Sequence, residues 1–66
     1  MSALEAAIAY LGWQGGTVHQ VKAALTEKET KLISMYNAMD EETDEEVIER
    51  VHRDLAFVQY LMSCLP

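Results

Sequence analysis

The stretch DEEVIERVHRDLAFVQYLMSCL, residues 44–65, carries apolar side chains at intervals that alternate between three and four residues. These positions are Ile48, Val51, Leu55, Val58, Met62 and Leu65. This spacing places all of them on one face of an α-helix, and nowhere does the sequence alternate as a half-buried strand does. The stretch therefore predicts an amphipathic helix of about 21 residues, which is about 31 Å long at 1.5 Å per residue.

A second long helix is predicted over residues 17–39. Its apolar positions follow the same alternating intervals and are Val18, Val21, Leu25, Leu32, Met35 and Met39. Lys28 interrupts this series. Either the helix is continuous and the lysine extends its ammonium group to solvent, or the chain bends at Leu25 and Thr26. We favour the continuous helix.

A short first helix is predicted over residues 3–11, with Leu4, Ile8 and Leu11 on one face and Gly12 after its last turn. Four stretches match the capping box, in which a Ser or Thr hydroxyl and a Glu or Gln three residues later bind free N–H groups at a helix start. They are Ser2–Glu5, Thr17–Gln20, Thr26–Glu29 and Thr43–Glu46.

The connection between the two long helices is short, at residues 40–43, and a short connection joins helices that lie antiparallel. We therefore expect an all-α fold in a single domain, residues 1–66, with an antiparallel helical hairpin and a short N-terminal helix. No internal repeat or low-complexity linker interrupts this arrangement.

Self-association is expected because a core in so short a chain supplies only about 3–5 kcal/mol of stability. The one cysteine cannot form a disulfide within the chain. From Leu55 onward the last helix is apolar on nearly every side, and such a helix must be covered on every side. The predicted dimer interface is the face formed by Phe57, Tyr60, Leu61 and Cys64, and the dimer is expected to be a helical bundle; the alternative is a closed three-helix monomer.

The net charge of −6 is concentrated in one short run. Its members are Asp40, Glu41, Glu42, Asp44, Glu45, Glu46 and Glu49. Acids in the first turn of the last helix interact favourably with the helix dipole, whereas acids after the end of the preceding helix do not. Helix capping therefore explains about half of the run. Glu46 with Arg50 and Glu49 with Arg53 also form i,i+4 pairs in the favourable order.

Ile33 and Tyr36 lie outside the main apolar series of the second helix, and antiparallel packing is expected to bring them close to Val47 and the acidic run. An apolar and aromatic patch bordered by carboxylates is typical of a protein-binding surface. The alternative is that a dimer partner or the first helix covers this patch. Together with the seven acids, these three residues form the predicted partner-binding site.

The sequence carries no motif that indicates catalysis, a metal site or a cofactor site. The stretch GWQGGTVHQV has glycines before a helix start but lacks the Lys-Ser/Thr ending of a phosphate-binding loop. The longest apolar stretch is shorter than the ~20 residues that a membrane span requires, and the N-terminal residues do not resemble a signal peptide. We therefore expect a cytoplasmic protein that is not an enzyme.

These features favour a non-catalytic regulator that binds another protein and alters its activity. An acidic run suits a basic surface, such as that of a nucleic-acid-binding protein, and opposes direct contact with nucleic acid. In size and charge the chain resembles small phage-encoded inhibitors of host proteins. Two alternatives remain: a helix-turn-helix DNA-binding regulator, with helices at residues 17–25 and 26–37 and its lysines toward phosphate, and a structural subunit that docks through its apolar C-terminal helix.

Overall fold

The computed structural model describes residues 2–66 as three α-helices, and no strand occurs among these residues. The helices are α1 (Ala3–Leu11), α2 (Val18–Asn37) and α3 (Glu45–Cys64). The all-α class is confirmed, and each observed boundary lies within two residues of the predicted one. The second helix is continuous through Leu25 and Thr26, so the alternative with a bend at that point is wrong.

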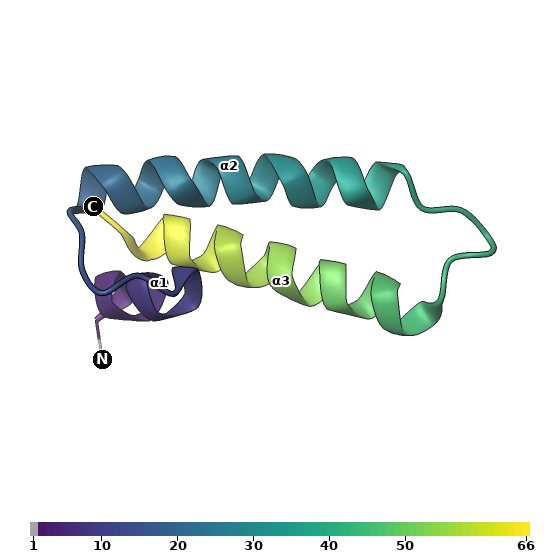
Figure 1. Ribbon diagram of the computed structural model, residues 1–66, viewed down its shortest axis with the longest axis horizontal. Helices are drawn as coiled ribbons and strands as arrows, with labels where there is room; N and C mark the ends of the chain where they lie inside the picture. The colour runs from purple at the N-terminus through teal and green to yellow at the C-terminus, as the bar shows by residue number, and fades with distance from the viewer. Residues whose placement is uncertain (1) are drawn as a thin grey trace.

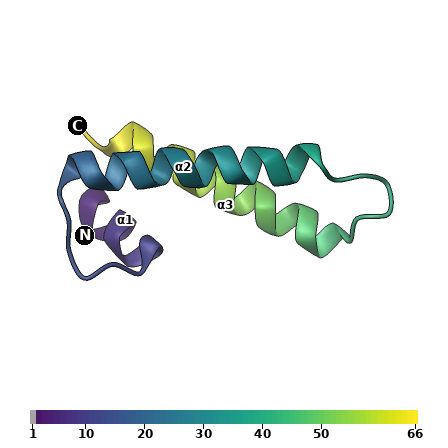
Figure 2. The same ribbon diagram turned by 45° about the horizontal axis from the view of Figure 1, so that its top comes forward.

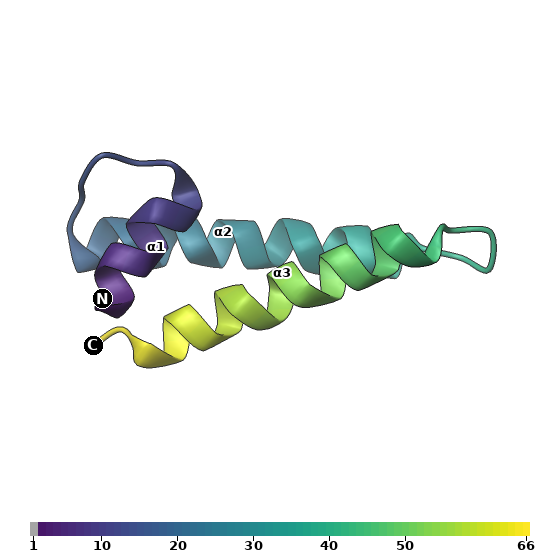
Figure 3. The ribbon, with the colours of Figure 1, turned by 90° about the horizontal axis from the view of Figure 1, so that it is seen from below.

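The helices α2 and α3 lie side by side and run in opposite directions, and the loop at residues 38–44 joins them (Figure 1). The short helix α1 packs against both of them at the end that also holds the two chain termini (Figures 2 and 3). The molecule is elongated, with extents of 40 × 20 × 19 Å. We call the end beside α1 the terminal half and the end beside the 38–44 loop the loop half.

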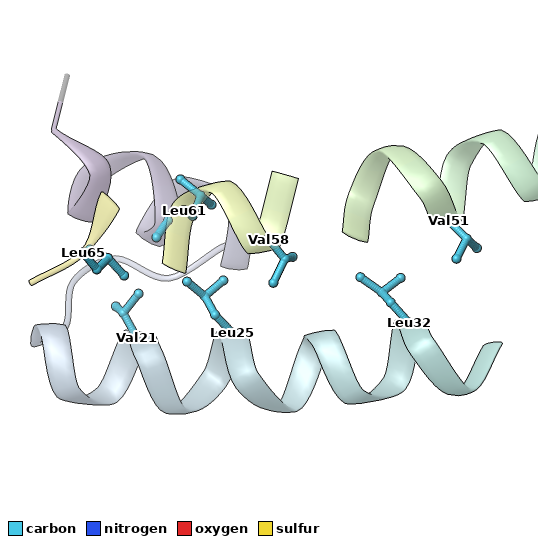
Figure 4. Close-up of a cluster of buried hydrophobic side chains, with 8 residues drawn as sticks. Val21, Leu25, Leu32, Val51, Val58, Leu61 and Leu65 are labelled. Carbon is cyan, nitrogen blue, oxygen red and sulfur yellow. The ribbon is translucent and has the colours of Figure 1, made fainter. Parts of the chain in front are cut away.

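The core lies along the contact between α2 and α3 (Figure 4). Its buried residues are Ala7, Val21, Leu25, Leu32, Val51, Val58, Leu61 and Leu65. Most of them belong to the two predicted apolar series. The other half-buried members of the two series are Val18, Met39, Ile48, Leu55 and Met62. The spacing of three and four residues thus located most of the core.

The burial of two apolar residues differs from the prediction. Met35 was assigned to the buried series of α2 but is 51% exposed. It follows Lys28 by seven residues, or two turns, so it lies on the side of α2 that α1 covers, but beyond the reach of α1. Leu61 was assigned to a dimer interface but is only 1% exposed. It belongs to the same buried cluster as Ala7 of α1, which packs on this side of α3.

The first turn and the last turn of α1 are fixed by short polar contacts. The Ser2 hydroxyl accepts a hydrogen bond from the backbone N–H of Glu5 at 3.2 Å. At the other end Gly12 has φ 75°, a left-handed conformation, and its N–H donates to the carbonyl of Ala9 while Trp13 donates to Ile8. This pair of bonds is the Schellman motif, which satisfies carbonyls at the end of a helix.

Two of the remaining capping predictions are wrong, and one is confirmed. Thr17 and Gln20 form the complete reciprocal box at the start of α2. Thr26 lies inside α2 and its hydroxyl donates to the Lys22 carbonyl at 2.8 Å, which is how threonine is accommodated within a helix. Thr43 belongs to the loop, because Asp44 is the residue whose carboxylate accepts the N–H of Glu46 at the start of α3.

Lys28 is compatible with a continuous helix because α1 provides a contact for its charge. Its ammonium nitrogen lies 5.8 Å from the centroid of the Tyr10 ring, within the range of a cation–π interaction. The lysine stem therefore passes along the edge of the core while the charge remains at the surface.

We expect Leu32→Ala to cost about 2–5 kcal/mol of unfolding free energy, because it leaves a cavity beside Val51 in a half of the molecule that buries few side chains. Met35→Ala removes a side chain of similar size that is half exposed, and should cost much less. Urea denaturation followed by circular dichroism measures both. Equal losses of stability in the two variants would contradict this description of the core.

Gly12→Ala should destabilise the chain by about 1–2 kcal/mol, because a Cβ disfavours the left-handed conformation at the end of α1. Gly15→Ala is the matched control, since a Cβ at that position meets no atom within 4 Å and its φ is not positive. Thermal unfolding of the two variants should show a lower midpoint for Gly12→Ala alone. A lower midpoint for Gly15→Ala of the same size would contradict the expectation.

Candidate protein-binding surfaces

Contacts between side chains define two sides of the α2–α3 pair. The first is the α1 side, where the Tyr10 ring lies edge-on to Phe57 at 5.3 Å between centroids and also contacts Lys28. On the second side the rings of Tyr36 and His52 stack, 4.8 Å apart at an interplanar angle of 29°. Tyr36 is eight residues from Lys28, about 80° around α2, and His52 is five residues from Phe57, about 140° around α3. We call this second surface the Tyr36 side.

The Tyr36 side carries aromatic and apolar surface in the loop half. Tyr36 is 44% exposed, and Ile33, one turn before it in α2, is 40% exposed. Glu29 precedes Tyr36 by seven residues and Glu45 precedes His52 by seven, so each helix also presents a carboxylate on this side. Of these two acids, Glu45 belongs to the predicted acidic run and Glu29 does not.

Val47 was predicted to join Ile33 and Tyr36, but its position in α3 is different. It lies four residues before Val51 and eleven before Val58, in line with the buried positions of α3. It is nevertheless 41% exposed, whereas Val51 on the same line of the helix is buried. Val47 thus belongs to the exposed end of the core series and not to the Tyr36 side.

Two members of the acidic run shape the connection between α2 and α3. The Asp40 carboxylate accepts the N–H of Glu42 at 2.9 Å and the hydroxyl of Thr43 at 3.3 Å, while the Thr43 hydroxyl accepts the N–H of Asp40 at 3.0 Å. Asp44 caps α3. The acids at residues 40–45, which we call the acidic tip, therefore form a turn held by its own side chains, with Glu41 and Glu42 exposed.

The last two acids of the run lie on the outer face of α3 with two arginines. Glu46, Glu49, Arg50 and Arg53 line an open hollow of about 210 Å³. The predicted pairs of Glu46 with Arg50 and Glu49 with Arg53 are not formed within 4.0 Å. Across residues 2–66 the one ion pair at that distance is Glu27 with Lys31, at 3.7 Å on the surface of α2.

The predicted dimer face is divided by α1. Leu61 is buried inside the chain, so it is not available at a surface. Phe57 is 40% exposed and packs against Tyr10, whereas Tyr60 is 62% exposed and Cys64 is an exposed free thiol. The first helix thus covers part of the face that the sequence assigned to a second copy, as the closed-monomer alternative anticipated.

The Tyr10 hydroxyl lies between α1 and α3, where its ring contacts Phe57. Burial between α1 and α3 raises its pKa above 10.0, and the negative charge of Asp54 raises it further. Both effects disfavour the phenolate form of the side chain.

Three further observations concern a membrane span, a metal site and a helix-turn-helix motif. None of the helices in residues 2–66 combines the length and the apolar character that a membrane span requires. Within the same residues, no three His, Cys, Asp or Glu side chains are grouped so that they could hold a metal ion. A helix-turn-helix motif would require two helices, at residues 17–25 and 26–37. This segment is the single helix α2, so the turn of the motif is absent.

No protein-family model, curated protein or solved structure matches this chain. Its function is therefore argued from its own surfaces.

The stability of the fold should fall as pH rises above about 10, because folded Tyr10 keeps its proton while unfolded chains lose theirs. The contribution is fully present below the unfolded pKa of 10.0 and is lost as pH rises through the raised folded value. Tyr10→Phe keeps the ring but removes the ionisation, so its unfolding free energy should fall less over this range. Identical alkaline profiles for both proteins, measured by urea denaturation, would exclude this role for Tyr10.

Proposed function

We propose that this chain is a non-catalytic protein-binding regulator that binds a basic surface of another protein through its acidic tip and its Tyr36 side. The observation that carries the proposal is the position of an exposed aromatic stack within the same half of the molecule as the acids. Occupation of a basic surface would block the contact of that partner with nucleic acid, so inhibition is the expected effect on the partner.

The charge of the tip supports a basic partner. Asp40 and Asp44 use carboxylate oxygens to hold the turn, and Glu41 and Glu42 extend into solvent. Clustered charges of one sign accelerate the association of an oppositely charged partner by 10-fold to about 1000-fold. The tip therefore suits the attraction and orientation of a basic protein.

The Tyr36 ring supports the second part of the proposal, which is that the bound partner is retained. Tyrosine is among the residues that most often dominate binding energy at protein interfaces. Here the ring is held in place by its stack on His52, so little freedom is lost when a partner covers it. Ile33 adds apolar area beside it.

The proposal is tested by affinity capture from a lysate of the cells that encode the chain, with variants that separate the two contributions. Glu41→Lys with Glu42→Lys and Glu45→Lys should slow association of the captured protein by at least about tenfold. Tyr36→Ala should mainly accelerate its dissociation, at a cost of about 2 kcal/mol. Surface plasmon resonance with the captured protein measures both rates, and circular dichroism verifies that each variant is folded.

Tyr60→Ala is the matched control, because it removes an exposed tyrosine from α3 at a distance from the Tyr36 side. The control should bind the captured protein as the wild type does. The proposal fails if the captured protein binds all of these variants with unchanged rates, or if it binds through a surface that Tyr60→Ala alone disrupts.

A further inference from the structure

Four charged residues on the outer face of α3 form a pattern that is complementary to itself. In the order Glu46, Glu49, Arg50 and Arg53, two acids are followed by two bases at mirrored spacings about a midpoint between residues 49 and 50. When a second α3 lies antiparallel about this midpoint, Glu46 faces Arg53 of the second copy and Glu49 faces Arg50. The two-fold symmetry then forms each pair twice.

These four charges are unpaired within one chain even though their sequence spacing allows two intrahelical pairs. No nitrogen and oxygen among them approach within 4.0 Å, and instead the side chains border a hollow of about 210 Å³. The guanidinium and carboxylate groups are therefore free to pair with groups outside the chain.

The first helix leaves this part of α3 uncovered. Its contact with α3 includes the Tyr10–Phe57 pair, and it packs only on the terminal half (Figure 3). Arg50 precedes Phe57 by seven residues, so it lies on the same side of α3 but two turns beyond that contact. A second copy can thus approach the first half of α3 without displacing α1.

We propose that two copies of this chain form an antiparallel homodimer through the outer face of α3, with Glu46 against Arg53 and Glu49 against Arg50 of the second copy. This interface differs from the Phe57 and Tyr60 face that the sequence alone suggested. It leaves the Tyr36 side free, so it does not depend on the proposed binding of a basic protein.

The test is sedimentation velocity on the whole chain over a range of concentrations, with variants that reverse the charge pattern. The wild type should approach twice the 7.4 kDa monomer mass as concentration rises. Glu46→Arg with Glu49→Arg makes every facing pair Arg–Arg, and Arg50→Glu with Arg53→Glu makes every pair Glu–Glu. Each double variant should raise the dissociation constant by about tenfold or more.

Two combinations restore complementarity. An equimolar mixture of the double variants should form a heterodimer, because every pair is again Arg–Glu. The quadruple variant has the same net charge as the wild type and a reversed but still self-complementary pattern, so it should form a homodimer again. Glu27→Arg with Glu29→Arg changes the net charge as much as the first double variant but lies on α2, and it should leave association unchanged.

A wild type that remains monomeric at the highest concentration would overturn the proposal. It would also be overturned if the double variants associated as the wild type does, or if neither the mixture nor the quadruple variant recovered association while circular dichroism showed folded helices. Loss of association in Tyr60→Asp with no effect of the charge variants would place the interface on the terminal half instead.

Discussion

The length of α1 is the constraint on which the rest of this structure depends. Nine residues form a helix of about 14 Å, whereas α2 and α3 are each about 30 Å long. Where α1 is present, it contributes Ala7 to a cluster that includes Leu25, Val58 and Leu61, all at most 1% exposed. Beyond it, Leu32 and Val51 are the buried side chains. The terminal half is therefore a small three-layered core, and the loop half is a pair of helices with one buried seam.

The surfaces of the loop half follow from this difference. A helix in a pair has only one covered face, so apolar residues on its other faces remain exposed, as Ile33, Met35 and Tyr36 are. The charges are also divided between the faces. The Tyr36 side presents Glu29 and Glu45, while the outer face of α3 presents glutamates and arginines together. The two proposals therefore use different faces: a basic protein is proposed for the first and a second copy of the chain for the second.

The periodicity of apolar residues was sufficient to predict the three helices and most of the core, because burial along a helix pair imposes that spacing directly. It could not predict which face α1 would cover. Leu61 and Phe57 both follow the helical pattern, and only the position of α1 buries the first and leaves the second 40% exposed. Capping was predicted less well, because Thr43 and Asp44 are adjacent and the side chain of either can accept an N–H at the start of α3. The Thr43 hydroxyl is instead bonded to Asp40 in the turn, so Asp44 caps the helix.

For the candidate surfaces, the acidic run was evident in the sequence, but its division into a tip and a self-complementary pattern required the geometry of the loop and of α3.

The self-complementary pattern also restricts how two copies of the chain can be oriented in the proposed dimer. In a parallel pairing each Glu46 faces Glu46 and each Arg50 faces Arg50, so every contact is repulsive. In the antiparallel pairing every contact is attractive, and each acidic tip lies beside the terminal half of the other copy and apart from the other tip. Exposed ion pairs contribute little affinity each, but like charges placed opposite one another are costly. For a chain with a net charge of −6, the arrangement that separates the tips is therefore the one that self-association can use.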